Sequence, residues 1–486
     1  MLTKFQQQYL RDIVRTGFNG RPIGSIIFAV TSSNHENTRR NPLPLYLRVM
    51  AIEEFSRDIQ ADIRIYPIPD IKQSDKFASY VIRQIFYQGG LDLNSNNTIL
   101  GSSTPSVINM FKQLGFENAP MELTSLEPET YSTLRPYEVI DELIKSGKNW
   151  HSDNAWHEHA SLATQNIYDK YKTGDLICEL FNDALLSDDA DITDTRNYDT
   201  YSLSMDNTIK FKFEDIRPFI KQGKIVDVGC STGSLIRLLA QEFQESDIIG
   251  IEAVRKFYEF CKTQEYPNPY VFFYRRNITD QNFKENTINT FIYSSILHEV
   301  YSYLGEDVLN TVLQNTYNQL ELNGRIVIRD VVGPEEPDKE VYMELIDTDG
   351  ASKGDITKLS TYRKFFRFAE DFLPRKIKYE EVTTGSRKII KLRIQDAYEF
   401  MSKKNYTDNW ASEMHEEFGF YSYSVWCKKL EQFEFKITAG SKPFTNPYIV
   451  EHSYQDKVTL FTFKDGRLID EAYPPTNMVL VGEKHI

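Results

Sequence analysis

Residues 224–237 constrain the fold of this chain more than any other stretch. The short apolar run over 225–228 is typical of a buried parallel strand. Gly229 and Gly233 follow it and bracket a tight turn, and from Ser234 onward apolar residues recur at helical spacing. A strand, a glycine turn and a helix in this order place a ligand at the carboxyl ends of a parallel sheet. The glycines let the backbone approach that ligand without a Cβ in the way.

The residues after this turn continue the alternation of strands and helices. Further strands are predicted over 247–252, 271–274, 289–295 and 325–332. Glu252 ends the second strand, about 20 residues past the glycine turn, where a carboxylate suits hydrogen bonding to ribose hydroxyls. The fourth strand runs into His298 and Glu299, so both side chains are expected at the same edge of the sheet.

The order of these motifs resembles the class I S-adenosylmethionine-dependent methyltransferases. The resemblance covers roughly residues 206–335 and resumes near the C-terminus; it is carried by Asp227–Gly233, Glu252, Asn277–Ile278, Ile296–His298 and Asn323–Ile328. Ser231 replaces the usual middle glycine, and Asn277 replaces the usual acidic residue, although asparagine can still pair with an adenine amino group. The alternative is a dinucleotide-binding domain, which fits the glycine spacing less well and predicts no Leu-His after the fourth strand.

The resemblance implies an α/β domain with a seven-stranded sheet, a methyltransferase activity, and S-adenosyl-L-methionine as cofactor. It assigns cofactor binding to Asp227, Gly229, Cys230, Gly233, Glu252, Asn277, Ile278 and Ser295. Methyl transfer from a sulfonium is an in-line displacement, so the protein mainly orients and desolvates the reactants. A base helps when the acceptor is a hydroxyl or a protonated amine.

His298 and Glu299 are the candidate catalytic residues. The near-neutral pKa of histidine suits a base, and His298 is expected beside the sulfonium. Two alternatives stay open. His298 can be a buried histidine bonded to backbone, and Glu299 can instead cap the following helix, because acids suit helix N-termini. Arg329 and Asp330, at the end of the fifth strand, are the other candidates at this edge.

The N-terminal stretch predicts a second parallel sheet, because strands over 26–30, 63–70 and 98–101 alternate with helices. Its strand exits resemble nucleotidylyltransferases of the nicotinamide-mononucleotide adenylyltransferase type; the match includes Thr31–Ser33, Asn41-Pro42, Arg48 and Ile68–Ile71. We therefore expect a second Rossmann-like domain over residues 1–150.

Both phosphate-binding motifs of that family depart from its pattern. The His-x-Gly-His motif is missing ahead of the first helix. Where the family has a Ser/Thr-x-x-Arg motif, residues 138–141 of this chain are acidic. Residues 132–135 have the composition of the Ser/Thr-x-x-Arg motif, but they stand too early in the sequence. Either the domain has lost adenylyl transfer and still binds a nucleotide, or the true start lies upstream of Met1. The first interpretation is favoured.

The rest of the chain is divided into regions by its pattern of apolar and polar residues. After a helical linker or cap over 151–212 we expect the methyltransferase core at 213–335, an insertion or substrate lid at 336–430, and the final core strands at 431–486. The insertion carries a Phe-rich helix, interpreted as core, and a strand pair over 376–382 and 388–394. His157 and His159 stand two apart and do not share a helix face, so no metal site is assigned.

The composition of the chain limits the kinds of molecule that it is expected to bind. The net charge is −14, which argues against a large phosphate-backbone footprint and makes nucleic acid an unlikely substrate. The four cysteines are scattered and form no CxxC pair, so neither a disulfide framework nor a zinc site is indicated. No signal peptide and no membrane span are recognised, and a cytoplasmic location is expected.

Together these features predict O- or N-methylation of a small-molecule or nucleotide-linked acceptor. The alternative is a bifunctional or regulatory protein of nucleotide metabolism with adenylyltransferase activity.

Overall fold

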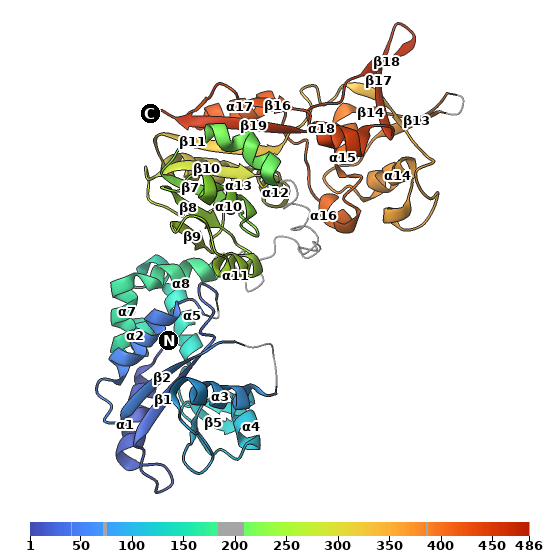
Figure 1. Cartoon of the computed structure of the whole chain (residues 1–486). Coiled ribbons are helices and arrows are strands. Elements are labelled where there is room, and N and C mark those ends of the chain that lie inside the picture. The colour runs from blue at the N-terminus through green and yellow to red at the C-terminus, as the bar shows by residue number, and fades with distance from the viewer. Residues whose placement is uncertain (40, 71–74, 183–208, 385–386, 486) are drawn as a thin grey trace. The chain divides into compact units, whose positions relative to one another are not determined.

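The structure, a computed structural model, describes residues 1–485 apart from 40, 71–74, 183–208 and 385–386 (Figure 1). The chain forms two compact units, Met1–Asp189 and Ala190–Ile486. Within the described residues, no helix is long and apolar enough to cross a membrane. The sequence at 196–200 allows either a segment that covers the methionine end of the cofactor or a plain helix-to-strand connection, and it lies outside the described residues.

The first unit contains short parallel strands flanked by helices. Its elements are α1 (Lys4–Thr16), β1 (Ser25–Thr31), α2 (Leu45–Ser56), β2 (Asp62–Ile68), α3 (Phe77–Gly89), β3 (Leu100–Gly101), α4 (Pro105–Gln113), β4 (Asn118–Ala119), β5 (Leu123–Leu126), β6 (Glu129–Tyr131), α5 (Pro136–Ser146), α6 (Asn154–His157), α7 (Leu162–Tyr171) and α8 (Thr173–Asn182).

Within the described residues, the strands of this unit do not form the single parallel sheet that was expected. β1 pairs in parallel with β2, but β3 pairs with β4 in a separate two-stranded sheet. Helices α7 and α8, from the stretch expected to be a linker, pack against α2 and α5 and belong to this unit.

The second unit contains the methyltransferase-like core and the insertion. Its core elements are β7 (Lys224–Val228), α10 (Ser234–Glu242), β8 (Asp247–Ile251), α11 (Arg255–Thr263), β9 (Val271–Tyr274), β10 (Ile288–Ser294), α12 (Leu297–Leu304), α13 (Glu306–Gln319), β11 (Leu320–Val331), α17 (Tyr423–Gln432), β15 (Phe435–Ile437), β16 (Lys442–Phe444) and β19 (Asn477–Lys484).

The core sheet has the strand order β15-β19-β11-β10-β7-β8-β9 (Figure 1). Neighbouring strands from β11 to β9 are parallel, and β19 runs antiparallel to β11. Among the described residues the sheet has eight strands and not the expected seven, because residues 442–444 add the short strand β16, which pairs with β19. The parallel part of the sheet agrees with the α/β prediction.

Helices cover both faces of this sheet, which explains why its central strands are apolar on both sides. On one face, strand residues such as Val226 and Ile328 pack with α12, α13 and α17. On the other face, Ile225 and Val327 pack with α10 and with Cys261 of α11. The carboxyl ends of the strands are left at one edge, where the predicted site residues lie.

The insertion is a separate five-stranded antiparallel sheet in the order β13-β14-β12-β17-β18. Its elements are β12 (Glu340–Leu345), α14 (Thr361–Asp371), β13 (Tyr379–Thr384), β14 (Arg387–Arg393), α15 (Ile394–Lys403), α16 (Trp410–Glu413), α18 (Pro447–Ile449), β17 (Val458–Lys464) and β18 (Arg467–Glu471). The Phe-rich helix α14 buries Phe365 and Phe368 in the core of this sheet, as predicted. Strands β17 and β18 join it although they lie within the stretch assigned to the final core strands.

Candidate active site

The glycine turn after β7 is held tightly between two neighbouring segments. The amides of Gly229 and Cys230 both donate to the carbonyl of Ile251, at 2.9 and 3.1 Å. Gly229 has φ +72°, and a Cβ there would lie 2.5 Å from Cδ1 of Ile296. Gly233 has φ +76° as well. Both positions therefore require glycine, and the turn follows a fixed path along the edge of the sheet.

Glu252 points back into this turn from the end of β8. Its carboxylate accepts from the amides of Ser231 at 2.7 Å and Val254 at 2.8 Å. Burial raises the pKa of Glu252 to about 7, although the backbone amides oppose that shift. Burial also raises the pKa of Asp227 to about 8, and the neighbouring Glu252 charge adds to the rise. The charge of Glu252 thus disfavours ionisation of Asp227, and ligand hydroxyls donating to Glu252 would favour its ionised form.

Lys212 is a site residue that sequence reasoning missed. It lies in the helical segment at 209–216, is buried, and its Nζ lies 3.2 Å from Oγ of Ser295. Burial lowers its pKa to about 7, Arg329 lowers it further, and Asp330 and Asp227 oppose the shift. No motif marks Lys212 in the sequence, because only the fold brings it to the strand ends.

Asn277 and Ile278 follow β9, the edge strand next to β8. Asn277 is buried and its Oδ1 accepts from the amide of Thr279 at 3.1 Å. Ile278 packs against the core of the sheet. The predicted cofactor residues therefore follow the carboxyl ends of neighbouring strands, β7, β8, β9 and β10.

His298 lies in the first turn of α12, at the end of β10, and is only 5% exposed. Its Nδ1 lies 2.7 Å from Oδ1 of Asp330, and its Nε2 lies 3.6 Å from Oε2 of Glu416. Burial alone would lower the pKa of His298, but the Asp330 and Glu416 carboxylates raise it to about 9. The expected near-neutral pKa is therefore wrong, because two carboxylates hold the imidazole in its charged form.

Asp330 also fixes the start of α12. Its Oδ2 accepts from the amides of Leu297 at 2.9 Å and His298 at 3.3 Å. Asp330, at the end of β11, thus caps these amides of α12, which is the role suggested for Glu299. Glu299 is buried in the same helix turn, and its charge acts on both His298 and Lys212.

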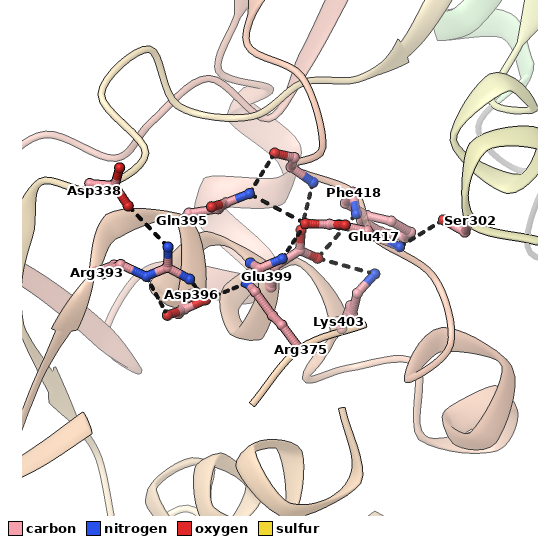
Figure 2. Close-up of polar contacts among 11 residues, drawn as sticks. Ser302, Asp338, Arg375, Arg393, Gln395, Asp396, Glu399, Lys403, Glu417 and Phe418 are labelled. Carbon is pink, nitrogen blue, oxygen red and sulfur yellow. Dashed lines mark hydrogen bonds and ion pairs between the residues drawn. The ribbon is translucent and has the colours of Figure 1, made fainter. Parts of the chain in front are cut away.

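Glu416 comes from the segment that links the insertion to the core. A polar network holds the next residues of that segment, Glu417 and Phe418 (Figure 2). The buried carboxylate of Glu399 on α15 accepts from the amides of Phe418 at 3.1 Å and Gly419 at 2.6 Å. The amide of Glu417 donates to Oγ of Ser302 on α12 at 2.8 Å. The segment is thereby tied to both the insertion and the core.

Charged groups surround that anchor (Figure 2). Lys403 Nζ lies 3.4 Å from Glu399 and 3.1 Å from the centre of the Phe418 ring. Arg375 pairs with Asp396 at 2.9 Å and also with Glu417. Because buried charges are costly unless paired, these contacts specify one position for the segment that carries Glu416.

His298, Glu299 and Glu416 are also a set that could hold a cation, since their ligand atoms lie within 4.8 Å of one another. A cation bound at Nε2 would replace the proton on that nitrogen, and Nδ1 would keep its contact with Asp330 at 2.7 Å. Without such an ion the neighbouring carboxylates favour the imidazolium form and raise the pKa of His298 to about 9.

Comparison with known proteins is consistent with this geometry. Residues 225–324 match a family model described as a methyltransferase domain. Among curated proteins, no relative matches the sequence. An S-adenosylmethionine-dependent methyltransferase from Mesorhizobium loti is similar in structure at 14% identity, with 56% of this chain and 97% of that chain covered and a TM-score of 0.34.

A second solved structure, an S-adenosylmethionine-dependent methyltransferase from Archaeoglobus fulgidus, matches at 10% identity over 60% of this chain and 100% of that chain, with a TM-score of 0.34. Residues 225–324 of the chain are a methyltransferase domain.

Proposed function

We propose that this enzyme methylates an oxygen or a nitrogen of a small-molecule or nucleotide-linked acceptor. The observation that carries the proposal is the buried polar cluster at the end of β10, where His298, Glu299 and Asp330 adjoin the glycine turn through Lys212 and Ser295. S-adenosylmethionine would be held by Asp227, Gly229, Cys230, Gly233, Glu252, Asn277, Ile278 and Ser295.

S-adenosylmethionine, when bound, would supply an activated methyl group for in-line transfer to the acceptor atom. The protein's contribution is orientation and exclusion of water. The proton released by the acceptor goes to Glu299, or to Nε2 of His298 once that nitrogen has lost its own proton. Because the pKa of His298 is raised to about 9, these two routes have opposite pH dependence.

The pH–rate profile distinguishes the routes. If His298 is the base, the rate rises as pH increases through about 9. If protonated His298 orients the acceptor while Glu299 takes the proton, the rate falls over the same range. His298→Asn removes the ionisation in either case, so it should abolish the inflection near pH 9.

The primary test uses calorimetry with S-adenosylmethionine. Gly229→Ala should abolish binding, because its Cβ would collide with Ile296 at 2.5 Å in a turn that must stay tight. Gly466→Ala is the matched control, since Gly466 has a similar φ of +76° and nothing within 4 Å of the added Cβ. Equal affinity in the two variants would contradict the assigned cofactor site.

Identifying the acceptor requires a separate experiment. Mass spectrometry of ligands that copurify with the enzyme would supply candidates. Each candidate is then incubated with methyl-labelled S-adenosylmethionine and tested for label transfer. Transfer only to nucleic acid or protein would contradict the proposed acceptor class.

For the N-terminal unit we propose nucleotide binding without adenylyl transfer. Arg48 donates to the carbonyls of Thr31 and Ser32, and so shapes the loop after β1. Arg135 pairs with Glu138 at 2.8 Å, and this contact neutralises an arginine that would otherwise be available to phosphate. Incubation with nicotinamide mononucleotide, ATP and magnesium should give no dinucleotide. Robust product would favour the alternative, a bifunctional enzyme with adenylyltransferase activity.

A further inference from the structure

Strand β1 in the N-terminal unit has no strand against its outer edge. It pairs with β2 along all seven residues, Ser25–Thr31, while β3 pairs with β4. Within the described part of the chain, no strand pairing joins β1 to β3. In a parallel ladder, alternate residues direct their N–H and C=O groups to opposite edges, so about half of those groups in β1 face away from β2. An edge of this kind is a template for another strand.

The side chains of β1 are also less buried than its position requires. Ile26, Ile27 and Phe28 are only half-buried and Ala29 is exposed, whereas residues 225–228 of the parallel strand β7 are all buried. A parallel strand covered by helices is normally buried on both faces. Helix α1 likewise has no buried residue. The apolar side chains of β1 are therefore only partly covered by the rest of this unit.

A cavity of about 1220 Å³ is lined by both β1 and β3. Its walls include every residue of β1 except Val30, both residues of β3, and apolar side chains of α1, α3 and α4. It exceeds the roughly 300–1,000 Å³ of a typical small-molecule pocket. Among the described residues that line it, only Arg21 and Asp70 carry charge, and both already have partners, Glu117 and Ser32. An uncharged occupant is complementary to these walls.

We propose that an extended, uncharged and mainly apolar segment of a partner polypeptide inserts as a strand between β1 and β3. A polypeptide fits because one wall is a backbone edge, and only another backbone supplies hydrogen-bond partners at regular intervals along it. A segment of about seven residues would span β1, since strands rise about 3.3 Å per residue. The proposal does not rest on the methyl-transfer reaction, whose residues lie in the other unit.

Hydrogen–deuterium exchange on the full-length protein tests this inference. The probe is a capped heptapeptide of alternating valine and isoleucine, with a lysine tail for solubility. Its twin carries proline at two central positions, so it keeps the apolar character but loses ladder N–H groups. At ten times its Kd, the first peptide should slow exchange in residues 25–31 by about tenfold, and the proline twin should not.

Two variants show whether the slowing comes from the cavity. Gly101→Trp places a large side chain in the cavity from β3, where an added Cβ meets nothing within 4 Å, and should abolish the protection. Tyr87→Trp, at an exposed position of α3 outside the cavity lining, should retain it.

Three outcomes would overturn the proposal. They are no protection by the heptapeptide, equal protection by both peptides, and protection that persists in Gly101→Trp. The second would indicate a cavity for apolar molecules in general. Protection of residues 25–31 by nicotinamide mononucleotide or ATP, without any by the heptapeptide, would indicate a nucleotide pocket instead.

Discussion

Asp330→Asn should change how the stability of the C-terminal unit depends on pH. The pKa of His298 rises from 6.5 to about 9 in the folded protein, mainly through the Asp330 carboxylate acting against burial. At about 1.4 kcal/mol per pH unit, this shift corresponds to about 3 kcal/mol. Because the folded pKa lies above the unfolded one, this stabilisation is fully present below pH 6.5 and is lost as pH rises through about 9.

The assay is urea unfolding read by pulse proteolysis, with peptides from residues 320–331 reporting the C-terminal unit. At pH 5.5 we expect the free energy of unfolding of wild type to exceed that of Asp330→Asn by several kcal/mol. At pH 9.5 this difference between the two proteins should be smaller by about 3 kcal/mol. Asp307→Asn, at an exposed position in the first turn of α13, is the control and should match wild type at both pH values. A difference between Asp330→Asn and wild type that is equal at both pH values would refute the imidazolium–carboxylate pair.

Three further changes test other parts of the site. His298→Ala should keep cofactor affinity within a few-fold and reduce turnover about 10²- to 10⁴-fold, measured by label transfer to an identified acceptor; near-wild-type turnover would make His298 structural. Glu399→Gln should destabilise the unit by about 1–3 kcal/mol in urea, because two backbone amides and Lys403 lose their charged partner, and unchanged stability would argue against the anchoring role. Lys212→Met should weaken S-adenosylmethionine binding in calorimetry more at pH 6 than at pH 8, since its pKa is lowered to about 7; a pH-independent effect would show that its charge does not act on the cofactor.

The parts of the site that the sequence predicted are those encoded locally. The glycine turn, the strand before it and the helix after it lie within 224–242, so pattern alone located them. Glu252, His298 and Glu299 could be placed because parallel strands deliver their last residues to one edge of a sheet. The structure agrees with these placements, and their catalytic and binding roles stay predictions.

The parts that sequence reasoning missed depend on long-range contacts. The pKa of His298 is set by Asp330 and Glu416, which come from two other segments of the chain. Lys212 reaches the site from a helical segment without a motif. The two strands β17 and β18 carry no signal of which sheet they join, since that depends on pairing with β12.

The broken sheet of the N-terminal unit was missed for a related reason. The alternation of strands and helices predicted the right elements, and β1, β2 and β3 lie close to their expected positions. Which strands pair with one another is not encoded in that alternation. Strand β3 has only two residues, so its own sequence does not determine which strand it pairs with. The surrounding packing determines that its partner is β4.

The position of β19 has a consequence for biosynthesis. This strand lies between β11 and β15 and is almost entirely buried, yet it comes after the whole inserted sheet in the chain. A ribosome releases the elements of the insertion before residues 477–484, so the inserted sheet can form while β11 still has an open edge. Because non-local pairings form slowly, the core is the last part of this unit to close. We therefore expect the core sheet to close late in folding, with the edge of β11 exposed until β19 pairs with it.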